Sequence, residues 1–286
     1  MSSNRTGAAF LGHGSPMNAL EQNRYTRTWQ ALGEAFPKPG AILMVSAHWY
    51  VNATALTAMA RPRTIHDFYG FPQALFDIQY PAPGYPEMVE EIEELVAPEA
   101  VFADHDSWGL DHGAWSVLLH AYPAADVPVV QLSINAGKPA QYHFDMGARL
   151  SALGERGVLV IGSGNVVHNL RAMDRANPDS AFPWARAFNE QAISLLTSNP
   201  EDAPGLVQLP GYAQVAPTPE HFLPVLYLAG HSAAIGVKPT VLVDGYAYGS
   251  LSMTSFGVEV PCPTLPGDLP GAAPLGTTAP AEQSNI

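Results

Sequence analysis

Near its N-terminus the chain reads Ala8-Ala9-Phe10-Leu11-Gly12-His13-Gly14-Ser15-Pro16, an apolar run that ends at a histidine between two glycines. Such a run is typical of a strand buried on both faces of a sheet. Glycines directly after it let the backbone turn sharply where the strand ends. Because α/β folds bind ligands at the carboxyl ends of their strands, His13 is the first candidate functional residue.

Similar apolar runs recur along the chain, with helical patterns between them. We expect central strands of a covered sheet at residues 8–11, 41–46, 129–134, 158–161 and 240–243. We expect helices at residues 25–36, 86–96, 114–122, 140–153 and 184–197. The alternation predicts an α/β fold: a central, mostly parallel or mixed sheet covered by helices, with the active site at the C-terminal ends of the strands.

Two stretches depart from this pattern. Residues 61–85 are rich in proline, glycine and aromatic side chains, which predicts a long ordered loop, and loops of that length are usually functional. Residues 261–286 are nearly uncharged and rich in proline, glycine, alanine and threonine, which predicts a flexible tail or an arm laid on the surface. We therefore expect one catalytic α/β domain over residues 1–260 and a C-terminal tail over residues 261–286.

The composition narrows the classes of function. Lysine and arginine number 13 against 26 aspartates and glutamates, so the net charge is −13, which argues against nucleic-acid and anionic-membrane partners. The single cysteine, Cys262, excludes an internal disulfide and a thiolate metal cluster. With neither a membrane-length apolar run nor a signal-peptide pattern, we expect a cytoplasmic protein.

Four of the 10 histidines stand at or after the end of an apolar run or near the start of a helical stretch. His13 and His48 each stand at the end of an apolar run, which indicates a metal site because imidazole is the commonest metal ligand. His168 lies in a loop after the run 158–161, at the same edge of the sheet. His221 stands near the start of an apolar helical stretch, where the helix dipole keeps imidazole neutral and able to ligate. Beside it, Glu220 offers an oxygen ligand, although its position favours a helix-capping role.

The remaining histidines have less decisive surroundings. His112, in Asp111-His112-Gly113, precedes a predicted helix and either contacts a substrate or is structural. His66 lies in the aromatic loop, which could wall a pocket for a flat ring. We interpret the other four as surface or core residues: His105, His120, His143 and His231.

Two rival motifs fail on their context. Gly162-Ser163-Gly164 follows a strand as in a dinucleotide-binding turn, but Val167 replaces the third glycine and no acidic residue follows at the expected place. Gly230-His231-Ser232-Ala233-Ala234 resembles a nucleophile elbow, but Gly236 and Pro239 follow too soon for the helix that an elbow requires. Neither a nicotinamide enzyme nor a serine hydrolase is favoured.

Taken together, the motifs resemble those of the class III extradiol ring-cleavage dioxygenases, and within them the 4,5-DOPA extradiol dioxygenase-like group. The resemblance covers the chain from about residue 8 to about residue 258. It rests on several motifs that occur in one order, at residues 12–16, 46–49, 64–72, 80–84, 111–113, 162–169 and 220–221.

The resemblance implies a non-haem Fe(II) enzyme that opens a catechol ring beside the diol with O2. By matching motifs, His13, His48 and His221 would hold the metal. His168 would be the acid/base residue, with direct ligation left open, and His112 would lie at the substrate. The protocatechuate-cleaving branch uses two histidines and a glutamate, whereas here the third position is His221. Imidazole-only sites also suit zinc, so Zn(II) is the alternative ion.

Two other classes of function remain open at this point. The same histidines could serve a zinc-dependent hydrolase by lowering the pKa of a bound water. A non-enzymatic binder on the same scaffold is the second alternative. The identity of the catechol is also open, and so is association into a homo-oligomer.

Overall fold

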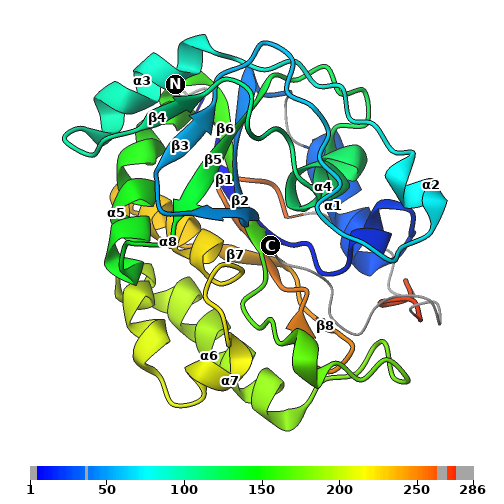
Figure 1. Cartoon of the computed structure of the whole chain (residues 1–286). Coiled ribbons are helices and arrows are strands. Elements are labelled where there is room, and N and C mark those ends of the chain that lie inside the picture. The colour runs from blue at the N-terminus through cyan, green and yellow to red at the C-terminus, as the bar shows by residue number, and fades with distance from the viewer. Residues whose placement is uncertain (1–4, 36–37, 263–268, 275–286) are drawn as a thin grey trace.

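The central sheet of the computed structural model has eight strands. The structure describes residues 5–35, 38–262 and 269–274. Across the sheet (Figure 1) the strands follow the order β4 (Phe102–Asp104), β3 (Ala55–Thr57), β5 (Val129–Asn135), β2 (Ala41–Val51), β6 (Val158–Gly164), β1 (Ala8–Gly12), β10 (Ser255–Val258) and β7 (Thr240–Val243). The central strands β5, β2, β6 and β1 are all parallel, whereas β10 and β7 pair antiparallel. The predicted mixed, mostly parallel α/β sheet is confirmed.

All five predicted strands are present, but one of them does not lie at the centre. β7 (Thr240–Val243) is the edge strand beside β10, and three of its four residues are exposed or half-buried. The expectation that it is central was therefore wrong, because four apolar or β-branched residues do not distinguish an edge from a centre. Three further strands of this sheet, β3, β4 and β10, were not expected, because their three or four residues are too few to show a period.

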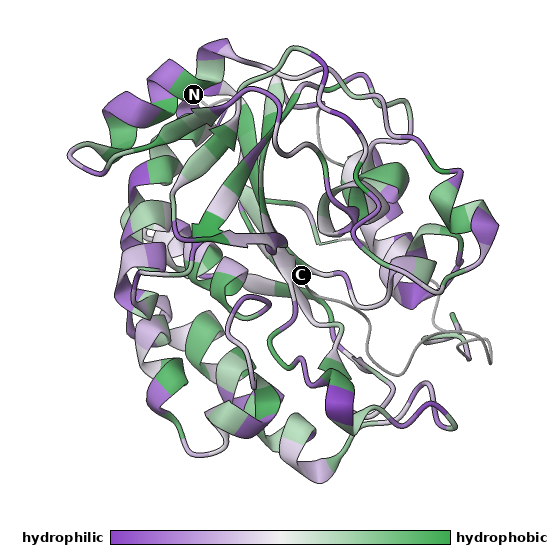
Figure 2. Cartoon of the chain, viewed as in Figure 1, coloured by the Kyte–Doolittle hydropathy of each residue, from purple (hydrophilic) through white to green (hydrophobic). Residues whose placement is uncertain are grey.

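Helices cover the sheet on both faces, and each face has its own core (Figures 1 and 2). One core packs beneath α3 (Glu87–Val96), α5 (Ala140–Leu150), α6 (Pro183–Ser198) and α8 (Leu223–Ile235). The other packs beneath α1 (Arg24–Ala35) and α4 (His112–Ala121). Neighbouring strand residues alternate between the cores, as Phe10 and Leu11 do, because successive side chains point to opposite faces.

The predicted helices are confirmed to within a few residues, apart from Phe36, which lies outside the described residues. The stretch 140–153 divides into α5 and a 3₁₀ helix, Ser151–Arg156. Shorter elements complete the chain: 3₁₀ helices Pro16–Ala19, Leu170–Ala172 and Pro200–Gln208, helices α2 (Gln73–Phe76) and α7 (Tyr212–Val215), and strands β8 (Tyr246–Ala247) and β9 (Leu251–Ser252). Of the helices in the described part of the chain, none has the length and apolar character needed to cross a bilayer.

The glycines after the run 158–161 serve packing. A Cβ at Gly162 would lie 2.8 Å from the Pro224 carbonyl oxygen, and one at Gly164 would lie 2.2 Å from that of His221. Both glycines thus let the start of α8 approach β6 at backbone distance, as glycine permits. The rejection of the dinucleotide motif is consistent with this role. The elbow-like motif around Ser232 lies wholly inside α8, so the rejection of a serine hydrolase also agrees with the fold.

Described parts of both irregular stretches pack on the α1–α4 side of the sheet, as Phe68 and Ala272 do. Residues 61–85 form the predicted loop, interrupted only by the four-residue helix α2. Of residues 261–286, the structure describes 261–262 and 269–274. The second segment is laid on the surface: Arg24 N donates to the Pro270 carbonyl, and the Tyr248 hydroxyl donates to that of Ala273.

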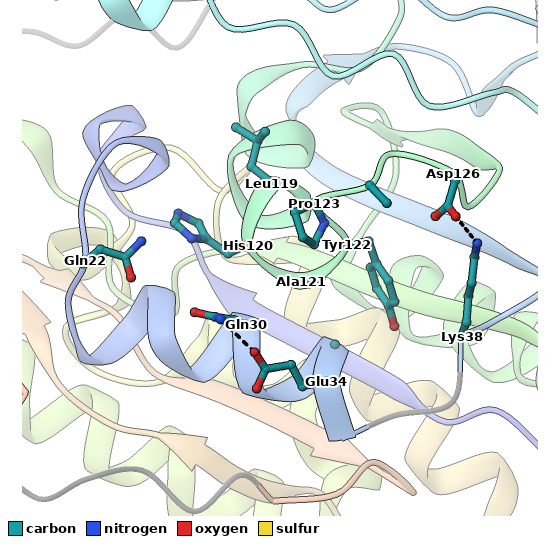
Figure 3. Close-up of a pocket in the computed structure, with 12 residues that line it drawn as sticks. Gln22, Gln30, Glu34, Lys38, Leu119, His120, Ala121, Tyr122, Pro123 and Asp126 are labelled. Atoms are coloured by element: carbon teal, nitrogen blue, oxygen red, sulfur yellow. Dashed lines mark hydrogen bonds and ion pairs between the residues drawn. The ribbon is translucent and has the colours of Figure 1, made fainter.

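A cavity of about 520 Å³ lies between α1 and the C-terminal end of α4 (Figure 3). Its polar lining is largely paired internally: Gln30 donates to Glu34, Lys38 pairs with Asp126, and the His120 ring contacts the Asn18 carbonyl. This cavity lies at the opposite end of α4 from His112.

Candidate active site and metal centre

Five buried histidines meet at the carboxyl end of the central strands. His13 directly follows β1, His48 lies near the end of β2, and His168 follows β6. His112 is the first residue of α4, and His221 stands two residues before α8. Their exposed fractions lie between 1% and 6%. The structure thus brings together every histidine that the sequence analysis singled out as a site residue.

The local backbone structure positions two of these side chains. β2 pairs regularly with β5 up to Val45 and resumes only at Tyr50, so His48 lies in a bulged segment. Bulges re-aim side chains and are common beside active sites. His13 N still donates to the Gly164 carbonyl, 3.2 Å away, which continues the pairing of β1 with β6 past the strand end.

The three histidines of the expected ligand set lie within contact of one another. The ring centroids of His13 and His48 are 5.1 Å apart, and that of His221 lies 5.3 Å from His13 and 4.9 Å from His48. His112 is 3.8 Å from His48 but 5.8 Å from His13. By ring centroids His221 is therefore nearly equidistant from the other two, whereas by ligand atoms it is His112 that lies within 4.8 Å of both His13 and His48.

Side-chain oxygens engage Nδ1 of the clustered rings. Nδ1 of His13 lies 2.9 Å from Ser163 Oγ, and that hydroxyl donates to the Gly113 carbonyl, 2.6 Å away. Ser163 must therefore accept from His13, which places the ring proton on Nδ1 and leaves Nε2 with a free lone pair. Such outer contacts orient metal-ligating histidines.

Asp67 lies between two other rings. Its Oδ2 is 3.2 Å from His48 Nδ1, and its Oδ1 is 2.9 Å from His112 Nδ1 and accepts from the His112 backbone N–H at 2.9 Å. Burial opposes ionisation of this carboxyl, but the rings of His112 and His48 outweigh burial and hold the pKa of Asp67 well below its usual range. Asp67 is therefore an anion between two imidazoles.

Glu220 contacts Nδ1 of His221, as Asp67 contacts Nδ1 of His48. Its Oε1 lies 3.2 Å from His221 Nδ1 and accepts from the Thr218 hydroxyl at 2.8 Å. The helix-capping role expected for Glu220 is wrong, because α8 begins at Leu223 and has no side-chain cap. The carboxylate instead turns back to the ring beside it.

The donor set fits a metal ion. Nδ1 of His13 contacts Ser163 Oγ, and Nδ1 of His48 lies 3.2 Å from Asp67 Oδ2. The Nε2 atoms of the two rings face each other at 3.2 Å, and with a proton on each Nδ1 both of them would present lone pairs. Two nitrogens bound at about 2.1 Å to one ion lie roughly 3.0 Å apart at a right angle and roughly 3.4 Å apart in a tetrahedron. Two lone pairs at this separation repel unless a cation lies between them. The potential ligands form two groups: His13, His48 and His112, and His168, Glu220 and His221.

Burial keeps the rings neutral. It is the first cause that lowers the pKa of His13, His48 and His168 well below the usual value, and the neighbouring histidines add to it. Burial, followed by the charge of His112, lowers the pKa of His221 to about 3. A neutral imidazole can bind a metal, so at pH 7 these rings need lose no proton to do so.

Behind the site, Asp111 ties α4 to the sheet. Its carboxylate accepts from the Ser46 hydroxyl at 2.7 Å, from Ala114 N at 3.1 Å and from the Gln131 amide. Burial, followed by the charge of Asp67, raises the pKa of Asp111 to about 6. The contact to Ser46, two residues before His48, joins the start of α4 to the bulged end of β2.

Sequence reasoning missed the oxygens that hold the rings. Asp67 and Ser163 contact the rings, and Asp111 holds the start of α4. All three lie inside the motifs at residues 64–72, 111–113 and 162–169, next to the histidines that were the candidates. A carboxylate next to a candidate ligand is the signal that could have found Asp67. His66 contacts the Ile78 carbonyl and aromatic neighbours and does not join the cluster. The loop does contribute Phe68, whose ring lies edge-on to His112 at 5.5 Å.

A buried cluster of imidazoles at the end of a parallel sheet is consistent with a metal site, and comparison with known proteins gives the class of enzyme. Residues 7–258 match the family model described as the catalytic LigB subunit of aromatic ring-opening dioxygenase. The chain belongs to this family and is an extradiol ring-opening dioxygenase.

Individual relatives agree with this class. The chain is 52% identical over 263 residues to a 4,5-DOPA dioxygenase extradiol of Escherichia coli K12, covering 90% of this chain and 96% of that protein. It is 34% identical to the protein of the same name from Beta vulgaris, covering 86% and 94%. A crystal structure of an uncharacterized Escherichia coli K12 protein superposes with a TM-score of 0.78 at 45% identity, covering 89% of this chain and all of that one.

Proposed function

We propose that this enzyme opens the ring of DOPA or a closely related catechol beside its diol, using O2 and Fe(II) held by His13, His48 and His221. The observation that carries the proposal is the pair of Nε2 atoms, 3.2 Å apart, on two rings whose other nitrogens contact oxygens. Relatives named for DOPA cleavage, at 52% and 34% identity over most of the chain, support the choice of substrate. Residues 1–260 would form the catalytic unit.

The Fe(II) ion would supply the Lewis acid for the diol and the redox chemistry that O2 requires. His221 is the proposed third ligand because its ring lies within 5.3 Å of both His13 and His48. The contact of its Nδ1 with Glu220 leaves Nε2 available. His112 would contact the substrate, since Phe68 presents an edge to its ring and extends an aromatic wall beside it.

His168 is the proposed acid/base residue. Its ring stacks on that of His221, with centroids 3.5 Å apart and an interplanar angle of 1°. The hydrogen bonds described for the structure give its ring no oxygen partner of the kind that Ser163, Asp67 and Glu220 provide, so its nitrogens can exchange protons.

The environment of His168 sets its protonation state. An imidazole ordinarily has a pKa near 6.5, but burial, followed by the charge of His221, lowers the pKa of His168 well below that value. The ring is therefore neutral and ready to take the proton of a catechol hydroxyl. The negative charge of Glu220 opposes the shift and would stabilise the ring once it is protonated.

The test compares metals and substrates on one preparation. Protein loaded anaerobically with Fe(II) is expected to consume one O2 per DOPA and to form a yellow semialdehyde. Zinc-loaded protein and a 3-O-methylated DOPA, which cannot offer two free hydroxyls, are the controls. Turnover of another catechol but not DOPA would overturn the substrate. Ester or amide hydrolysis by the zinc form without O2 uptake by the iron form would overturn the metal and the chemistry.

A further inference from the structure

The carboxylate of Asp67 is shared between two histidines that have different proposed roles. Its two oxygens lie 3.2 Å from Nδ1 of His48 and 2.9 Å from Nδ1 of His112. Its side chain is 9% exposed, and those of the two rings are 2% and 4% exposed. Solvent therefore cannot compete effectively for these three groups.

The chain is held just before Asp67 by contacts of the Arg63 and Ile65 backbone. Ile65 N donates to the Leu110 carbonyl at 2.7 Å, and the Leu110 N–H donates to the Arg63 carbonyl at 2.9 Å. The Trp115 indole donates to the Ile65 carbonyl at 2.8 Å. The loop that carries Asp67 is thus fastened to α4 and to the segment before it.

The contacts between the carboxylate and the rings are short but not aligned. Of the described atoms, His48 Nδ1, Asp67 Oδ2 and His112 Nδ1 are buried and lack a partner of hydrogen-bond geometry. A buried polar atom left without a partner costs about 1–3 kcal/mol, so such atoms demand a reason. The carboxylate lies against both ring nitrogens, so a single group is within reach of each of them.

We propose that Asp67 is a positioning residue that keeps the proton of both His48 and His112 on Nδ1, so that both Nε2 atoms face the centre of the site unprotonated. A single carboxylate thereby orients both His48, a proposed metal ligand, and His112, which is proposed to contact the substrate. The assignment of these two roles rests on the proposed function, whereas the position of the two protons does not.

A purely structural role would have a different signature. The His112 N–H that Asp67 accepts is one of the free backbone donors at the start of α4, and a carboxylate there also favours the helix dipole. If that were the whole role, Asp67→Asn would change stability and leave the ring protons in place. In the proposal, the variant's amide N–H₂ would face a ring N–H, and one ring would have to move its proton to Nε2.

The experiment reads the ring protons directly. The full-length chain is labelled with ¹⁵N-histidine and studied by nitrogen NMR, first with zinc bound and then without metal. The signals lost in His48→Gln and His112→Gln assign the resonances of these two rings, and the chemical shifts give their tautomers. The wild type is expected to carry both protons on Nδ1. Asp67→Asn is expected to move at least one of them and to weaken zinc binding about 10–100-fold. Asp67→Glu is expected to restore part of that affinity.

Asp77→Asn is the matched control, because Asp77 lies in the same loop, is exposed and contacts only Gln73 among the described side chains. It is expected to leave tautomers and zinc affinity unchanged. Wild-type rings protonated on Nε2 would overturn the proposal, even if Asp67→Asn failed to fold. Unchanged tautomers in a folded Asp67→Asn would overturn it as well. Inactivity on catechols with the expected tautomers would overturn the proposed function alone.

Discussion

Two groups of buried histidines differ in what surrounds them. The rings at the end of the sheet contact the oxygens of Ser163, Asp67 and Glu220. His143, in α5, and His231, in α8, are equally buried. Nδ1 of His143 contacts the Tyr227 hydroxyl, and His231 has no partner for either nitrogen among the described residues. Burial lowers the pKa of His143 and His231 to about 4, as it lowers those of His13, His48, His168 and His221. Burial therefore makes a histidine neutral, whereas only the rings at the end of the sheet lie together around a shared centre.

The largest effect expected from this comparison is the loss of metal. His13→Ala removes one of the two facing Nε2 atoms and is expected to weaken metal binding by more than about 100-fold, since losing an outer-shell partner alone costs 10–100-fold. His143→Ala removes an equally buried ring outside the cluster and is expected to retain metal. Metal content after gel filtration and zinc titration measure the difference. Equal metal loss in the two variants would erase the distinction between the groups.

A smaller effect is expected inside the cluster at His168, the ring without an oxygen partner. His168→Ala is expected to keep bound metal and to lose about 10²–10⁴-fold in kcat, which is the usual contribution of a positioned acid/base group. Added imidazole is expected to restore part of the rate. Oxygen uptake with a catechol measures it, and an unchanged kcat would remove His168 from the acid/base role.

The smallest effect concerns stability at low pH. The pKa of His231 is lowered to about 4 chiefly by burial, with the charge of Arg5 adding to it, so the unfolded chain binds more protons than the folded one below pH 6.5. Its contribution is complete above pH 6.5 and is lost as the pH falls toward 4. At pH 5 the loss is about 2 kcal/mol.

His231→Leu is expected to shrink the difference in unfolding free energy between pH 7.5 and pH 5 by that amount, with catechol turnover unchanged. Urea unfolding at both pH values measures the difference. A wild-type pH dependence in the variant would show that His231 is protonated in the folded protein. A fall in turnover would show instead that the α5–α8 histidines take part in the site.

Much of the fold followed from local pattern. The runs at residues 8–11, 41–46, 129–134 and 158–161 all became central strands, because long apolar runs must be covered on both faces. Thr240–Val243 showed the limit of that pattern, since its place at the edge depends on which strand pairs with it. The three missed strands of the central sheet, β3, β4 and β10, are set by pairing partners distant in the chain.

The sequence by itself determined which histidines meet at one edge of the sheet. A histidine at the end of a buried parallel strand must lie at the carboxyl edge of the sheet, so His13, His48 and His168 were bound to share that edge. Only the tertiary structure decided how the rings are held. His13 meets Ser163 across 150 residues and His112 meets Asp67 across 45. Contacts between residues so far apart in the sequence depend on how the loop 61–85 and α4 pack against the sheet. A pattern within a short stretch of sequence does not contain that information.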